Sequence, residues 1–149
     1  MTDERETLLQ KEADAWAAFL AAAERVPGEL RSAPEVVPGW SVIDLAFHNG
    51  KWAELAGTHL EQKAAGTFVD EDQPDEVWQA MNDGWAQESK ALTWEQAVAI
   101  AEAGRMKART ALEALLDVDA AAASAFGEET FDHYPEHTDE IVRFAEDRT

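Results

Sequence analysis

Two histidines near the carboxyl end, His133 and His137, have a spacing that could bind one metal ion. Residues i and i+4 of a helix lie on the same face, about one turn apart, and metals bind neutral imidazole. The pair alone is a weak signal, because ordinary packing also produces it. Pro135 stands between them; if Asp132 caps the helix, Pro135 is the third helical residue, where a missing N–H costs nothing. Both histidines then lie in the first turn, whose partial positive charge favours neutral imidazole.

His48 is the natural third ligand. It lies on an apolar stripe with Leu45 and Trp52, where a lone charged imidazole would be costly. The alternative is a core histidine hydrogen-bonded to a carbonyl or carboxylate. His59, eleven residues further on, lies about 16 Å along the helix at 1.5 Å per residue. Since a metal–nitrogen bond is about 2 Å, His59 is not expected to share the ion.

Three neutral histidines leave coordination positions open, which is typical of a catalytic metal and not of a closed structural site. The expected ion is zinc, with nickel, iron or manganese as alternatives. The chain has no cysteine, so the nucleophile would be water or an external low-molecular-weight thiol. Asp132, Glu136 and Glu129 could orient the imidazoles or act as a general base. For Asp132, helix capping is the favoured alternative.

Arg105 and Arg109, four residues apart, could hold a substrate carboxylate with bidentate geometry. The favoured alternative is that they pair with Glu102 or Glu113 on a solvated helix face. The tryptophans most often belong to a core, although one or two could wall a pocket.

The elements that must position these residues are helical, because strand signals are nearly absent and Ala, Glu, Leu and Gln dominate. The second helix has the clearest start: Ser41 and Asp44 form a capping pattern, and Gly66 can end it after Ala65. A second capping pattern at Thr93 either restarts or kinks the third helical region. Helices are expected at about 2–25, 42–65, 75–92, 93–117 and from 132 onward, with a loop at 67–74. Residues 118–131 are ambiguous, with a short helical turn at 120–123.

Four main amphipathic helices predict an all-α four-helix bundle, and the length of 149 residues fits one domain, 1–149. The net charge of −19 argues against nucleic acid, because binding phosphates requires clustered Lys and Arg. It also favours a soluble, monomeric or weakly associated chain. The charged start and the lack of a long apolar run predict a cytoplasmic protein without a membrane span.

Two segments together resemble a known family. The run GWSVIDLAFHNGKW (39–52) resembles the segment of DinB/YfiT-like proteins in which a Trp-(Ser/Thr)-Val turn opens the second helix and leads to the first metal histidine. The run FDHYPEHTDEI (131–141) resembles the family's H-x-x-x-H, from which the proline departs mildly. The resemblance covers nearly the whole chain and extends to Asn82.

The resemblance implies an up-down-down-up four-helix bundle with a metal site formed by His48, His133 and His137. The superfamily is related to the amino-terminal domains of mycothiol-dependent maleylpyruvate isomerases. Its members are often homodimers and include metal-dependent hydrolases and transferases that use mycothiol or bacillithiol. The expected function is therefore a metal-dependent S-transferase or hydrolase acting on a small molecule. The alternatives are a non-catalytic metal-binding stress or sensor protein and an interaction module with an empty histidine cluster.

Overall fold

The regular secondary structure is helical throughout the residues that the computed structural model describes, 3–69 and 73–148. The prediction of an all-α fold is therefore confirmed for this part of the chain. None of the described helices is both long enough and apolar enough to cross a membrane. The elements in chain order are α1 (Glu4–Arg25), a 3-10 turn (Gly28–Leu30), α2 (Val42–Ala65), α3 (Asp75–Ser89), α4 (Trp94–Ala114), α5 (Ala120–Gly127) and α6 (Tyr134–Glu146).

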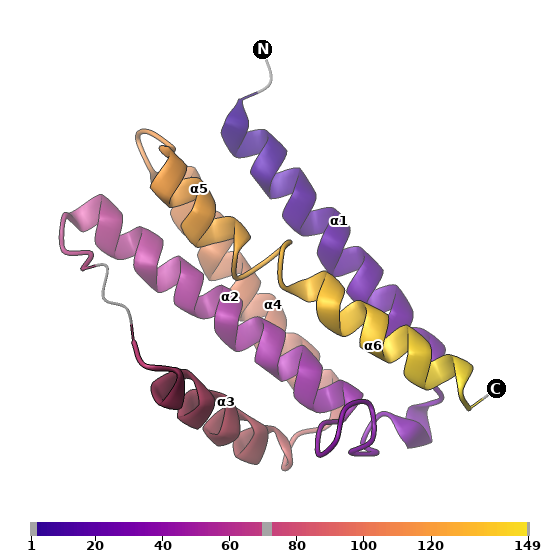
Figure 1. The fold of residues 1–149 in the computed structure, drawn as a ribbon. Coiled ribbons are helices and arrows are strands. Elements are labelled where there is room, and N and C mark those ends of the chain that lie inside the picture. Colours follow the sequence, from indigo (N-terminus) through magenta and orange to yellow (C-terminus); the bar gives the residue numbers. More distant parts are fainter. Residues whose placement is uncertain (1–2, 70–72, 149) are drawn as a thin grey trace.

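The helices pack in two pairs (Figure 1). α2 lies along α4 and runs in the same direction, and α6 lies along α1 and runs in the opposite direction to the first pair. α5 precedes α6 on the same side of the molecule, whereas α3 lies outside this arrangement, against α2. This arrangement brings the first third of α2, which contains His48, next to the start of α6, where His133 and His137 lie.

Both predicted capping patterns are confirmed. The Ser41 hydroxyl accepts a hydrogen bond from the Asp44 backbone N–H (3.1 Å), and the Asp44 carboxylate accepts one from the Ser41 N–H (2.8 Å). Thr93 and Gln96 make the same reciprocal pair at 3.1 and 3.0 Å. The third helical region therefore ends and restarts as α4.

Other helix ends differ from the prediction by a few residues. The expected start at Thr2 lies outside the described residues, and α1 begins at Glu4 and ends at Arg25 as expected. α3 ends at Ser89 and not at 92, and a turn follows in which the Leu92 N–H donates to the Ser89 carbonyl (3.0 Å). In the predicted loop at 67–74, residues 70–72 are outside the described part, and the others form no regular structure.

The carboxyl-terminal third contains an additional helix. α4 ends at Ala114 and not at 117, where the Arg5 guanidinium binds the carbonyls of Leu112 and Leu115. The ambiguous stretch then forms the eight-residue α5, capped by the Asp119 carboxylate. The expected single turn at 120–123 is therefore too short.

The contact between α2 and α4 depends on glycine. A Cβ atom on Gly50 would overlap the backbone of Ala101, and one on Gly104 would overlap the Gly50 carbonyl. The backbones approach this closely only because both positions lack side chains. The contact fixes the position of α2 along the axis of α4, and with it the position of His48.

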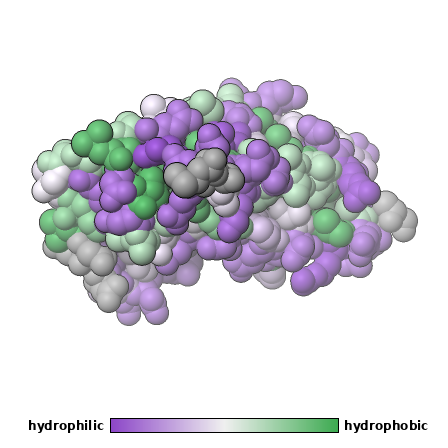
Figure 2. All heavy atoms as spheres, turned by 90° about the horizontal axis from the view of Figure 1, so that it is seen from above, coloured by the Kyte–Doolittle hydropathy of each residue, from purple (hydrophilic) through white to green (hydrophobic). Residues whose placement is uncertain are grey.

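Charge is spread over the surface. Hydrophilic side chains cover much of the face seen in Figure 2, and hydrophobic residues form separate small patches. The most exposed large apolar side chains are Leu116, Val69 and Met106, and scattered exposed apolar residues of this kind are normal for soluble domains.

Candidate metal centre

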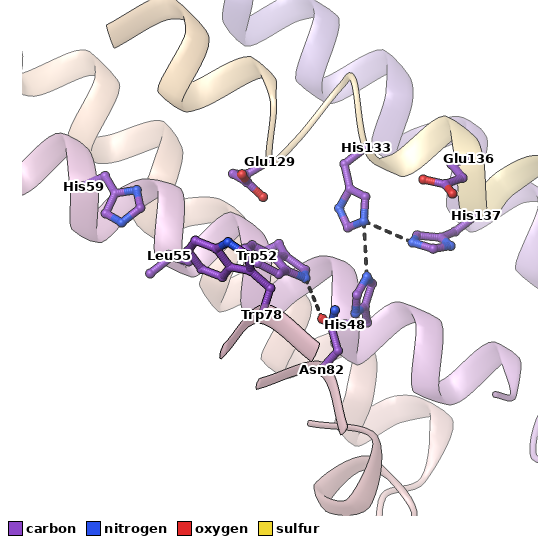
Figure 3. Close-up of a pocket in the computed structure, with 10 residues that line it drawn as sticks. All are labelled: His48, Trp52, Leu55, His59, Trp78, Asn82, Glu129, His133, Glu136 and His137. Carbon is purple, nitrogen blue, oxygen red and sulfur yellow. Dashed lines mark hydrogen bonds between the residues drawn. The ribbon is translucent and has the colours of Figure 1, made fainter. Parts of the chain in front are cut away.

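Three imidazoles converge where α2 meets the start of α6 (Figure 3). The His133 Nε2 atom lies 3.2 Å from His48 Nε2 and 3.0 Å from His137 Nε2. One ring nitrogen from each residue lies within 4.8 Å of the other two. The structure thus brings together the three predicted ligands, from positions 85 and 4 residues apart in the chain.

The donor set fits one divalent ion. Three nitrogens bonded to a tetrahedral zinc at about 2.0–2.1 Å lie about 3.3 Å from one another, close to the two short separations here. Hydrogen bonding alone serves the cluster poorly. A proton on His133 Nε2 can be donated well to only one neighbour, and the buried Nδ1 atoms of His48 and His133 have no hydrogen-bond partner within the described part of the chain.

Burial holds two of these histidines neutral. Loss of solvent, followed by the nearby His137 and His133, lowers the pKa of His48 to about 2. The same desolvation, followed by His137, lowers the pKa of His133 to about 4. The ring of His48 lies against the indoles of Trp40 and Trp52 with centroids 5.2 and 6.3 Å away. Neutral nitrogens that hold lone pairs at neutral pH are what a metal requires.

The start of α6 corrects one prediction. Asp132 is not the N-cap; His133 holds that position, with φ −101° and ψ −47°, and no side chain caps the helix. The cause is the preceding turn, in which the Thr130 carbonyl accepts from the N–H groups of both His133 and Tyr134. This turn already gives His133 a helical backbone, so its ring still faces that of His137. Pro135 is the second helical residue, where it disrupts no intrahelical bond.

Glu140 orients the third ligand, and the sequence reasoning missed it. Its carboxylate lies 2.6 Å from His137 Nδ1. A proton on Nδ1 donated to this carboxylate leaves the lone pair on Nε2, directed at the other histidines. The available signal was the i, i+3 spacing of Glu140 from His137 on α6. Of the candidates chosen from sequence, Asp132 makes no side-chain bond to an imidazole among the described residues.

A cleft of about 530 Å³ opens beside the histidines. One wall is aromatic: the Trp52 indole donates to the Asn82 side chain at 3.1 Å and packs on Trp78 and Trp85 at 5.5 and 5.2 Å. His59 lies at the far end, outside the histidine cluster as predicted. The residues that line the cleft are His48, Trp52, Leu55, His59, Trp78, Asn82, Glu129, His133, Glu136 and His137.

Two of the predicted acidic candidates, Glu129 and Glu136, line this cleft. Burial, followed by the neighbouring Glu128, raises the pKa of Glu129 to about 7. A carboxyl group with that pKa is present in both protonation states at neutral pH, which suits proton transfer.

Arg105 and Arg109 lie elsewhere. Both bind the fully buried Glu12: Arg105 through two bonds of 2.6 and 2.7 Å, Arg109 through one of 2.9 Å. Arg105 also pairs with Glu102 at 2.8 Å, which the favoured alternative predicted, but Arg105 is buried and not on a solvated face, and the acidic partner of Arg109 is Glu12. The hydroxyl of Tyr134 completes the group with a 3.0 Å bond to Glu12. Neither arginine lines the cleft.

Comparison with protein-family models, with curated proteins and with solved structures found no match for this chain. The fold and the site by themselves define an all-α protein with a candidate three-histidine metal centre beside an aromatic cleft.

Proposed function

We propose that this protein is a metal-dependent enzyme that acts on a small molecule, either as an S-transferase using a low-molecular-weight thiol or as a hydrolase. The observation that carries the proposal is the convergence of three Nε2 atoms at the mouth of a cleft. Three protein ligands leave at least one coordination position for a reactant. When bound, a divalent ion supplies a lowered pKa for water or thiol and polarises a carbonyl.

The residues around the centre have separate tasks in this proposal. Glu140 fixes the tautomer of His137 through Nδ1. Glu129 lies on the cleft wall with a pKa near neutrality, so it can present either a proton or a negative charge to the substrate. Trp52 and Trp78 contact the substrate with their indole faces and exclude water from that side of the cleft.

A DinB/YfiT-like, up-down-down-up four-helix bundle remains part of the proposal. Two features support it: the paired directions of α1 and α6 against α2 and α4, and the capped turn before His48. The thiol route depends on this resemblance, whereas the hydrolytic route depends on the site alone. Zinc is the first choice of metal, because imidazole ligands in an open three-histidine set suit it. A cytoplasmic location belongs to the same proposal, because a thiol cosubstrate stays reduced there.

Elemental analysis of purified protein tests the metal. The wild type should carry close to one equivalent of a divalent transition metal, and His48→Ala, His133→Ala and His137→Ala should each lose it. His59→Ala is the matched control, since His59 lines the same cleft outside the cluster. Full metal content in His48→Ala would refute the three-histidine centre.

Activity separates an enzyme from a binder. Metal-loaded protein is assayed with a panel of esters and amides, and with electrophiles plus mycothiol, bacillithiol or glutathione. Turnover that disappears in His133→Ala and persists in Glu113→Gln, an exposed position on α4 outside the cleft lining, supports the enzyme. One bound metal without turnover on either panel would favour a metal-binding stress or sensor protein.

A further inference from the structure

Two of the three chain segments that line the cleft contain no positive charge, whereas the third, α2, contains Lys51 and Lys63, neither of which belongs to the cleft lining. Residues 64–89, which include α3, and residues 110–142, which include α5 and the start of α6, have many Asp and Glu and no Lys or Arg. None of the ten side chains lining the cleft is a lysine or an arginine. A ligand carboxylate or phosphate would therefore meet no cationic side chain on this lining.

The acidic side chains in the cleft are themselves without partners. Within the described residues, neither the Glu129 nor the Glu136 carboxylate has a hydrogen bond or an ion pair. The charged side chain that raises the pKa of Glu129, after burial itself, is the acidic Glu128. Glu136 is exposed, where an unpaired carboxylate is ordinary, but Glu129 is half-buried. Other buried or half-buried carboxylates are paired, as Glu12, Asp44 and Glu140 are. An unpaired, half-buried carboxylate that lines a cleft is suited to a cation from outside.

The opposite wall offers aromatic faces. Trp52 and Trp78 lie 5.5 Å apart with their planes at 48°, and the bond to Asn82 fixes Trp52. Figure 3 shows these indoles on the α2 and α3 side and Glu129 on the side of the segment between α5 and α6. A cation held over an indole face is attracted by the ring quadrupole, most strongly where water is excluded. A second pocket, which shares Trp78 and Glu129 with the cleft, contains one such contact, in which Lys63 lies 4.3 Å from the ring centre of Phe68.

We propose that the cleft selects an organic cation, an alkylammonium or quaternary ammonium group on an apolar or aromatic body. Its positive group lies between Glu129 and the indole faces of Trp52 and Trp78. Its remainder extends toward the three histidines. Identifying this cation as the substrate rests on the proposed function, whereas its binding to the cleft requires no metal.

The test uses a ligand series matched in shape: benzyltrimethylammonium, its neutral isostere neopentylbenzene, and the anion phenylacetate. A quaternary ammonium neither titrates nor coordinates metal, so its binding is read independently of the centre. Calorimetry at physiological ionic strength, with metal-loaded and with chelator-treated protein, should give an affinity for the cation about tenfold above that for either other ligand.

Variants locate the site. Glu129→Gln and Trp78→Leu should each weaken cation binding about fivefold or more, and Glu129→Gln should leave the neutral isostere unchanged. Glu113→Gln is the matched control, because it removes the same charge from an exposed position on α4 outside the cleft lining. Unchanged cation affinity in Glu129→Gln, equal affinity for all three ligands, or tighter binding of phenylacetate would overturn the proposal. If Glu113→Gln weakened cation binding as much as Glu129→Gln, the proposal would also be overturned, because the affinity would then depend on the net charge of the protein.

The two proposals fail separately. Cation binding by protein that never retains metal would refute the metal-dependent function and support this inference. One equivalent of metal together with no charge preference would do the reverse, and Glu129 and Glu136 would then serve only to balance the charge of the ion.

Discussion

Two polar clusters lie next to each other in this protein and differ in how completely they are paired. Glu12 is fully buried, and its two oxygens accept four hydrogen bonds, from Arg105, Arg109 and Tyr134. One residue earlier than Tyr134, His133 belongs to the histidine cluster, in which two buried Nδ1 atoms have no partner among the residues that the structure describes and three Nε2 atoms face one another. Neighbouring residues of one helix start therefore serve two different environments.

The difference separates structure from function. The Glu12 carboxylate, which accepts four hydrogen bonds, is fully paired, and its role is to hold α1, α4 and α6 together. A buried group of lone pairs that face one another lacks a partner, and a metal ion is the partner that uses all three. Completeness of pairing therefore distinguishes the arginine cluster from the candidate metal centre better than residue type does.

The largest effect is expected from breaking the complete cluster. Glu12→Ala leaves the buried Arg105 with Glu102 as its remaining acidic partner and removes the acidic partner of the half-buried Arg109, and should lower the free energy of unfolding by about 3–5 kcal/mol. Urea unfolding of metal-free protein measures it. Glu35→Ala, which removes an exposed ion pair with Arg148, should cost less than about 1 kcal/mol. Equal stability of the two variants would show that the Glu12 cluster is not structural.

Next comes the orientation of the metal ligand. Glu140→Gln weakens the acceptor of the His137 Nδ1 proton and should reduce metal affinity about 10- to 100-fold. Competition with a chromogenic chelator measures the affinity. Asp139→Asn, on the exposed neighbour, should leave it unchanged; loss in both variants would indicate a general charge effect.

In metal-free protein, the histidine cluster should make the free energy of unfolding depend on pH below neutrality. The pKa of His48 is lowered to about 2 in the folded state, against about 6.5 when unfolded. Above about pH 6.5 His48 is neutral in both states. As the pH falls from about 6.5 toward about 2, only the unfolded chain takes up the proton. The free energy of unfolding therefore falls by about 1.4 kcal/mol for each pH unit in this range.

Wild type and His48→Leu, both treated with chelator, test this pH dependence. Between about pH 7 and about pH 5 the wild type should lose about 2 kcal/mol more unfolding free energy than the variant. Denaturant titrations at the two pH values measure it. Parallel losses would mean that His48 is not held neutral by its surroundings.

The smallest effect concerns the aromatic wall. Asn82→Ala removes the acceptor of the Trp52 indole and should lower stability by about 0.5–1 kcal/mol. Thermal unfolding detects it. Gln79→Ala, on an exposed pair of the same helix, should stay within about 0.5 kcal/mol of wild type. A shift in the control as large as in Asn82→Ala would remove the special role of that bond.

The sequence predicted what local rules govern. Helical spacing brought His133 and His137 together, the apolar stripe of α2 placed His48, and both capping patterns located helix starts. Each of these signals lies within one or two helical turns, where backbone geometry alone fixes which side chains are neighbours.

Tertiary contacts caused the differences. The interior position of Glu12 follows from arginines about 93 residues away, although its place between Leu8 and Trp16 on one helix face was a usable sign. The wrong cap at Asp132 reflects the turn through Thr130, which capping statistics do not include. α5 forms from an alanine-rich stretch that lacks an amphipathic pattern, so periodicity gave no indication of its length.

The glycine contact between α2 and α4 bears on how mutational data for this protein should be read. Gly50 lies two residues after His48 and touches neither the cleft nor an imidazole, yet one methyl group there must displace α2 from α4. Saturation mutagenesis scored by metal retention should therefore mark Gly50 as intolerant. A survey of that kind would assign a chemical role to a position whose whole contribution is the absence of a side chain.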